Sequence, residues 1–304
     1  MTAYMYAALA RLKARMALKR NFSTALLLCF LCELPSLLAM VFLMMSLSDF
    51  SQEITDGIHE QGQAYVDKLR QMTIDDLYMQ MDHGLMVAAI ICAVLSLILV
   101  FLRLSAIHSQ FKLLRGEDIS PKDAFSRLDQ MYKAIGLVIC RAVLMVLWLL
   151  PGIAIAFLGS LLSVGSGGDS VSVAWVGMQA TIMLSFGALL VFGVMGYIRY
   201  IFAEYVMADK PETGVFASIR EGRALVKGNS GRVLMMLISF IFWYLMISFV
   251  SGVFSGIIGT VISMALSIVI SLYMSTCIAA LYEQMHQTEE EARKVIRDPN
   301  GTVE

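Results

Sequence analysis

Two charged side chains, Glu33 and Arg141, lie deep inside long apolar stretches of the sequence. A charge at the centre of a membrane-spanning helix costs about 2.5–3.5 kcal/mol on insertion scales, so both should face the protein interior. Counted from the basic ends of their stretches, Glu33 lies about 16 Å deep and Arg141 about 10 Å deep, a gap that an arginine side chain can close. One hypothesis is a paired polar site for a proton or an anion. The alternative is a structural ion pair, or an arginine that reaches the headgroups.

Sulfur and imidazole groups give weaker signals. Cys29 and Cys32 form a Cys-x-x-Cys motif, but apolar surroundings do not activate thiolates and no second pair completes a zinc site. All five cysteines fall in apolar stretches, which favours free thiols over disulfides. Met79, Met81 and His83 are ligand types for Cu(I), yet a chain with 22 methionines produces such groupings by chance. We expect no metal site and no cofactor.

Motifs of common enzymes are absent. The sequence has no GxxxxGK[ST], HExxH or GxSxG motif and no glycine-rich dinucleotide fingerprint. The longest polar segment, 48–83, is too short for a conventional soluble catalytic domain. The sequence therefore predicts no catalytic residue, and an enzyme ranks third among the interpretations.

Composition indicates that lipid is the solvent of this chain. Of its 304 residues 58% are hydrophobic and only 15% charged, with a mean hydropathy of +0.73. Soluble domains are about half apolar and about a quarter charged. We therefore predict an all-α polytopic membrane bundle, with residues 1–304 as a single membrane domain.

Six apolar stretches are long enough to cross a bilayer, which takes roughly 20 helical residues. They are 22–47, 84–102, 134–163, 173–198, 233–249 and 257–281. The last two are nearly continuous, but Gly252, Gly256 and Gly259 predict a tight turn between them rather than a helix-packing motif. The first resembles a signal peptide in its basic flank, but its apolar stretch is too long for one.

Lys and Arg counted loop by loop set the orientation. The first 20 residues carry five, the connections 103–133 and 199–232 carry six each, and the tail 282–304 carries three. The remaining sizeable loop, 48–83, has Lys68 and Arg70 against eight acidic residues. Both termini are thus predicted on the cytoplasmic side, with 48–83 as an external acidic loop. Apolar residues at mostly helical spacing predict helix within this loop: Ile54, Ile58, Tyr65, Leu69 and Met72.

Each outward span follows a short amphipathic segment. In residues 1–20, the stripe of Met5, Leu9, Leu12 and Met16 beside basic residues is typical of a helix in a membrane interface. The second segment opens at Ser120-Pro121-Lys122-Asp123, a helix-start pattern, and continues with an apolar face of Phe125, Leu128 and Tyr132. The third carries an apolar stripe of Val215, Ile219 and Val226 and ends at Gly228.

The order of interfacial helix, outward span and returning span thus occurs three times, as a weak parallel repeat. The alternative is a set of independent solvated loops. In either case, basic helices at the inner leaflet attract anionic lipid, at about 1 kcal/mol per well-placed Lys or Arg. Nucleic acid is not expected, because positive-inside topology already explains the charge. The candidate contacts with lipid or a protein partner are Arg11, Arg15, Lys19, Arg220, Arg223 and Lys227.

The second half of the chain resembles a known family. An Arg199-Tyr200 pair, the turn Ala208-Asp209-Lys210-Pro211 and a helix ending in Lys227-Gly228 precede a span with the aromatic pair Phe242-Trp243. These features, and the Pro151-Gly152-Ile153 pattern after Trp148, are similar to bacterial integral membrane proteins catalogued as domain of unknown function 975. Here residues 154–197 separate the two patterns and add a span. The resemblance implies a bacterial plasma-membrane protein and brings no established activity, cofactor or catalytic residue.

The leading interpretation is a non-catalytic accessory or scaffold protein that contacts anionic lipids or a partner, which includes a second copy of the chain. The alternative is a transporter of a small solute or lipid, with Glu33 and Arg141 in a polar path.

Overall fold

The computed structural model describes residues 3–62, 83–165, 171–254 and 256–297. Over these residues the chain is helical, without strands. The described helices are α1 (Ala3–Arg20), α2 (Phe22–Gln61), α5 (His83–Leu114), the 3₁₀ helices η1 (Pro121–Phe125) and η2 (Leu128–Gln130), α6 (Met131–Gly165), α7 (Val171–Tyr200), α8 (Ala203–Asp209), α9 (Val215–Val226), α10 (Ser230–Val253) and α11 (Gly256–Arg297).

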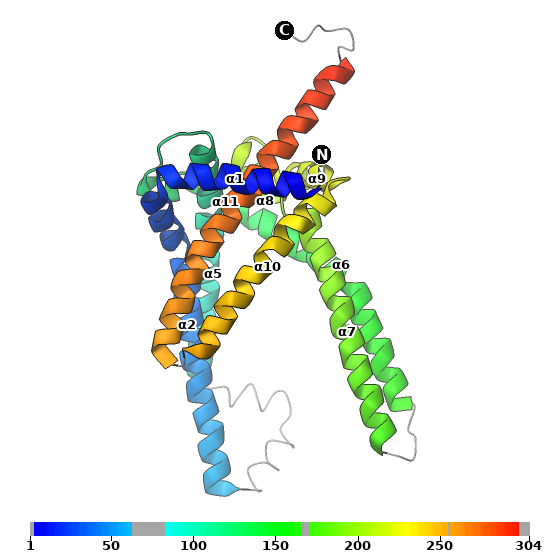
Figure 1. Cartoon of the computed structure of the whole chain (residues 1–304). Helices are drawn as coiled ribbons and strands as arrows, with labels where there is room; N and C mark the ends of the chain where they lie inside the picture. The colour runs from blue at the N-terminus through cyan, green and yellow to red at the C-terminus, as the bar shows by residue number, and fades with distance from the viewer. Residues whose placement is uncertain (1–2, 63–82, 166–170, 255, 298–304) are drawn as a thin grey trace.

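Six of these helices, α2, α5, α6, α7, α10 and α11, are long and apolar enough to cross a membrane, which confirms the predicted six-span all-α fold. In Figure 1 they extend from one shared end of the molecule, where α1, α8 and α9 also lie. We call this end, formed by α1, α8, α9 and the adjoining ends of the spans, the basic end. The hairpin of α6 and α7 diverges from α10 with distance from that end (Figure 1).

Two glycines lie at turns that the sequence predicted. Gly228 follows α9 with φ of +85°, a left-handed conformation that glycine adopts without steric cost. In the first turn of α11, a Cβ on Gly259 would lie 1.5 Å from the carbonyl oxygen of Phe254, the residue that follows α10. No other residue fits this turn, so the two last spans form a hairpin instead of one long helix.

Helix α1 lies across the ends of the spans (Figure 1). It packs on α10 and α11 through Ala7, Ala10 and Ala14, each at most 1% exposed, because alanine lets helices approach closely. The predicted apolar stripe faces the opposite way: Leu9 is 41% and Met16 61% exposed. An apolar stripe that the protein leaves uncovered is what an interfacial helix requires.

The two later amphipathic segments differ from each other. The Ser120 backbone N–H donates to the Asp123 carboxylate over 2.8 Å, as the predicted start pattern requires, but the segment then forms two short 3₁₀ helices rather than an amphipathic α-helix. The third forms α9, with Ile219 and Val226 buried. In the loop 48–83, Ile54 and Ile58 belong to the helical extension of α2, whereas Tyr65, Leu69 and Met72 lie outside the described residues.

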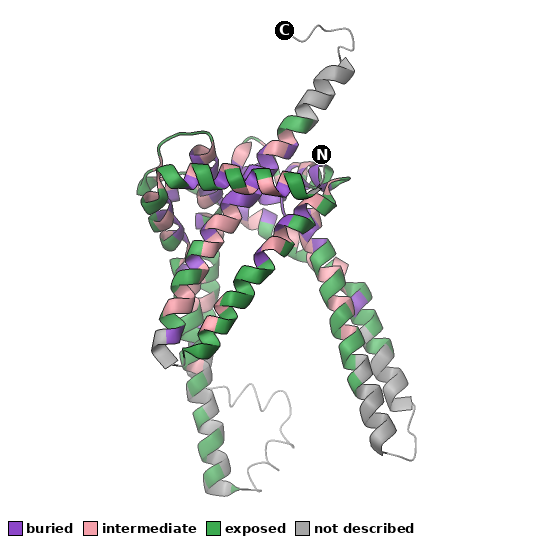
Figure 2. Cartoon of the chain, in the orientation of Figure 1, coloured by how far each residue is buried: buried purple, intermediate pink, exposed green. Residues whose placement is uncertain are grey.

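Burial is concentrated at the basic end, while the far halves of the spans are largely exposed (Figure 2). The core there includes the short connecting helix α8, in which residues 203–208 are all buried. Around it, four rings meet at centroid distances of 5.4–6.3 Å: Phe111, Phe202, Tyr205 and Tyr282. Because α8 is held in this core, polar side chains on it and around it have fixed positions.

Candidate functional site

An ionic cluster joins three helices around the buried Glu204 of α8. Arg103 Nε of α5 donates to Glu204 Oε2 over 2.8 Å, and Arg141 Nη1 of α6 donates to Glu204 Oε1. The Glu204 and Arg141 side chains are only 10% and 14% exposed. Charges this deep are stable only when paired, and the two arginines against one carboxylate leave the cluster with a net charge of about +1.

Glu33 does not form the ion pair with Arg141 that we hypothesised. It accepts a hydrogen bond from Ser271 Oγ of α11 over 3.2 Å, and the ion pairs among the described residues do not include one between Glu33 and Arg141. Arg141 stacks on the Tyr197 ring at 5.4 Å and takes its carboxylate from α8. The depth argument considered only residues inside spans, so it missed an acid in a buried connecting helix.

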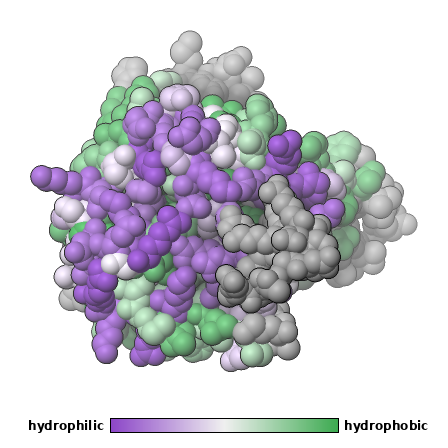
Figure 3. Space-filling view, turned by 90° about the horizontal axis from the view of Figure 1, so that it is seen from above, coloured by the Kyte–Doolittle hydropathy of each residue, from purple (hydrophilic) through white to green (hydrophobic). Residues whose placement is uncertain are grey.

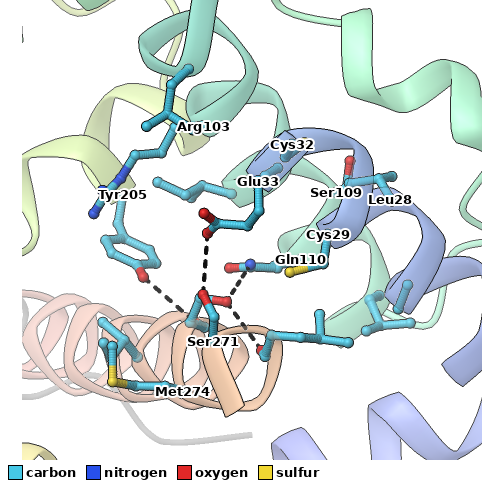
Figure 4. A pocket seen from close by; sticks show the side chains of 18 of the residues that line it. Leu28, Cys29, Cys32, Glu33, Arg103, Ser109, Gln110, Tyr205, Ser271 and Met274 are labelled. Atoms are coloured by element: carbon cyan, nitrogen blue, oxygen red, sulfur yellow. Dashed lines mark hydrogen bonds between the residues drawn. The ribbon is translucent and has the colours of Figure 1, made fainter. Parts of the chain in front are cut away.

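Glu33 and Arg141 nevertheless line one cavity. This cavity, of about 270 Å³, lies between α2, α5 and α11 and reaches the Glu204 cluster through Arg103 and Arg141. Figure 4 shows Glu33 turned toward Ser271 of α11, and Gln110 turned toward the same helix, where its amide donates to Ser275. A second cavity of about 410 Å³ also contains Arg103, Arg141 and Glu204. The two arginines thus stand at the wall that both cavities share.

A second ionic network ties the basic end together. Arg115 donates to Asp209 over 2.5 Å and to Glu283 over 3.3 Å, and Lys13 of α1 donates to Glu283 over 2.7 Å. Burial alone would lower the pKa of Arg115, but the hydrogen bonds and charges of Asp209 and Glu283 raise it above its ordinary value. The Tyr282 hydroxyl also donates to Asp209. These contacts hold α1, α5, α8 and α11 in one arrangement.

In addition to Asp209, four other residues of the family-like pattern have structural roles. Arg199 lies 5.5 Å from the Trp148 ring, and Tyr200 is 5% exposed. The Pro211 carbonyl accepts from Lys133 Nζ over 2.6 Å, and Gly228 is the left-handed residue after α9. They shape the connection from α7 to α10.

An open groove of about 780 Å³ runs between α7, α9 and the start of α10. Four cationic side chains line it: Arg199, Arg220, Arg223 and Lys227. Its other walls include Trp148, Met195, Ile198 and Leu234. Within the described part of the chain, Arg220, Arg223 and Lys227 form no ion pair, unlike Arg103, Arg115 and Arg141.

Arg11, Arg15 and Lys19 lie on α1, away from this groove. Arg11 Nε donates to the Ala7 carbonyl, while Arg15 and Lys19 are exposed. Seen from the basic end, hydrophilic residues cover much of the surface (Figure 3). The predicted contact residues thus form two sets, one on α1 and one in the groove.

The remaining sequence candidates give no metal site in the described residues, where no group of three or more His, Cys, Asp or Glu is placed to hold an ion. Cys29 and Cys32 are buried free thiols that donate to the carbonyls of Ile268 and Leu102. Met79 and Met81 lie outside the described residues.

Three residues of these sites were not singled out from the sequence: Glu204, Arg103 and Gln110. Glu204 was detectable as a lone carboxylate within the apolar run Ile201–Ala208, where a charge needs a partner. Arg103 was counted only as a loop cation, although α5 continues to Leu114.

Comparison with protein-family models, curated proteins and solved structures found no match for this chain. The resemblance to domain of unknown function 975 therefore stays a prediction.

Proposed function

We propose that this protein is a non-catalytic accessory or scaffold protein of a bacterial plasma membrane that holds anionic lipid at its basic end. In this proposal both termini are cytoplasmic and the basic end faces the inner leaflet, as the Lys and Arg distribution predicts. The resemblance to domain of unknown function 975 supports the bacterial assignment.

One observation carries the proposal: the groove between α7, α9 and α10 combines four cations with apolar walls. Arg220, Arg223 and Lys227 are exposed and Arg199 is half-buried, so their donors can reach a phosphate. Trp148, Met195 and Leu234 offer apolar surface for the first part of an acyl chain.

The start of α10 adds to the positive electrostatic potential of the groove. Ser230 and Gly231, the first residues of this 24-residue helix, line the groove. Backbone N–H groups at a helix start carry a partial positive charge and favour anions. An anionic phospholipid, with its phosphate at the cations and its chain along Trp148, matches both the charge and the polarity of the groove.

Reversal of the groove charges tests this. The triple variant Arg220→Glu, Arg223→Glu, Lys227→Glu should lose retained phosphatidylglycerol in native mass spectrometry, while the variant Lys122→Glu, at an exposed cation of the same end, should keep it. Equal phosphatidylglycerol retention by the triple variant and the unaltered protein would remove the basis of the proposal.

A transporter of a small solute or lipid is the second candidate, because Glu33 and Arg141 line one cavity whose arginine wall is shared with a second cavity. Flux of a solute into proteoliposomes that Glu33→Gln abolishes, with folding intact, would replace the scaffold proposal by this one.

A further inference from the structure

The Gln110 side chain of α5 carries an acceptor without a partner at the wall of the 270 Å³ cavity. Gln110 is 8% exposed, and no described group donates to its Oε1. Its Nε2 donates to Ser275 Oγ over 2.7 Å. A buried acceptor without a hydrogen bond costs free energy comparable to a lost hydrogen bond, so a donor that reached this oxygen would be favourable.

The orientation of this amide is fixed by its neighbour. The Ser275 hydroxyl proton is used on the Leu272 carbonyl, 3.0 Å away, so Ser275 Oγ can only accept from Gln110. The nitrogen of the amide therefore faces Ser275, and the oxygen lies at the cavity wall as a buried acceptor. Figure 4 shows this amide on the same side of the cavity as Glu33.

Glu33 makes this end of the cavity an acceptor end. Its carboxylate accepts one hydrogen bond from Ser271, and an ionised carboxylate has further lone pairs. A ligand here must supply several N–H or O–H donors, and a positive charge on it offsets that of Glu33. A primary ammonium group, with three donors, meets both conditions.

The same cavity also has hydrogen-bond donors, on Arg103 and Arg141. Each guanidinium carries five N–H donors, and each of the two uses one on the shared carboxylate of Glu204, so further donors remain for a ligand. Their cluster of about +1 and the charge of Glu33 sum to about zero around the cavity. Apolar walls, among them Leu28, Leu99 and Ile107, lie along the same cavity.

We propose that this cavity binds a small zwitterion, with its primary ammonium on Glu33 and Gln110 Oε1 and its carboxylate or phosphate on Arg103 and Arg141. The volume of about 270 Å³ suits a molecule of a few heavy atoms with water rather than a bare ion, since one water takes about 30 Å³. The proposal concerns binding at a site separate from the lipid groove, and it requires no transport.

The test is equilibrium binding to the full chain in nanodiscs of phosphatidylcholine, whose quaternary ammonium has no N–H to donate. β-Alanine and O-phosphoethanolamine are the zwitterionic probes, and ethylammonium and propionate are the single-charge controls. At least one zwitterion should bind about tenfold or more tightly than both controls, because it alone satisfies both the acceptors and the donors.

Variants assign the contact. Glu33→Gln and Gln110→Met should each weaken zwitterion binding by about tenfold or more, at unchanged melting temperature and oligomer size. Ser109→Ala is the matched control, since Ser109 lines the same cavity but, among the described residues, its hydroxyl donates to the Ser105 carbonyl. Failure of both zwitterions to bind, equal binding of ethylammonium, or binding that neither variant weakens would overturn the proposal.

Addition of phosphatidylethanolamine to the nanodiscs separates two sources of the same chemistry. Competition with the soluble probe would identify a lipid headgroup as the occupant, and unchanged binding would identify a free solute. The lipid proposal for the groove is tested by different residues, Arg220, Arg223 and Lys227, so the two can fail independently.

Discussion

Arg141 of α6 forms its ion pair with Glu204 of α8 rather than with Glu33 of α2. The same carboxylate accepts from Arg103 of α5, so one acid in a seven-residue helix pairs with arginines from two spans. This contact fixes where α6 meets the rest of the bundle, and the cavity between α2, α5 and α11 lies beside it.

Glu204→Gln should therefore be strongly destabilising. It leaves Arg141, 14% exposed, without its carboxylate, and removing one partner of a buried pair costs about 3–5 kcal/mol. Thermal unfolding of the protein in detergent should show a clearly lower midpoint. Arg103→Met should cost less, because the Arg103 side chain is 56% exposed. A Glu204→Gln midpoint equal to that of the unaltered protein would show that the pair does not stabilise the fold.

Gly222 permits the close approach of α9 to the start of α8. A Cβ there would lie 2.8 Å from the Ala203 nitrogen and 3.0 Å from the Phe202 carbonyl carbon. Gly222→Ala should cost about 1–3 kcal/mol, as overpacking does. Gly187→Ala, where a Cβ meets nothing within 4 Å in mid-helix, should be neutral or stabilising by about 0.5–1 kcal/mol. Equal effects of the two changes on the unfolding midpoint would contradict this packing.

Docking of α1 should depend on its alanine face and not on its exposed stripe. The double variant Ala10→Leu, Ala14→Leu places bulk where both residues are 0% exposed, so amides of α1 should exchange hydrogen faster in mass-spectrometric measurements. Leu9→Ala, on the 41% exposed stripe, should leave that exchange unchanged. The reverse order would mean that α1 packs on the bundle through its apolar stripe.

The orientation can be checked with one cysteine on each side. Ser126, at the basic end, and Gln52, in the extension of α2, are both exposed. A membrane-impermeant maleimide should label Gln52→Cys in intact cells and Ser126→Cys only after permeabilisation. Labelling in the opposite order would place the termini outside.

The sequence predicted the six spans because a bilayer crossing needs only about 20 apolar residues in a row, a property of local composition. It also predicted the stop at Gly228 and the Gly259 turn, which depend on backbone geometry at one residue. The hypothesis that Arg141 pairs with Glu33 was wrong, because the pairing depends on how α8 folds back between the spans and brings Glu204 to Arg141. Gln110 is one of several polar residues near the end of α5. Only the packing of α11 shows that its amide nitrogen bonds to Ser275 while its oxygen has no hydrogen-bond donor.

Native mass spectrometry of the gently extracted protein tests the central claim most directly. The account predicts bound phosphatidylglycerol on the unaltered protein and on Lys122→Glu, and its loss from the triple variant Arg220→Glu, Arg223→Glu, Lys227→Glu. Equal phosphatidylglycerol occupancy in all three proteins, with folding intact, would contradict the assignment of the groove as a lipid site.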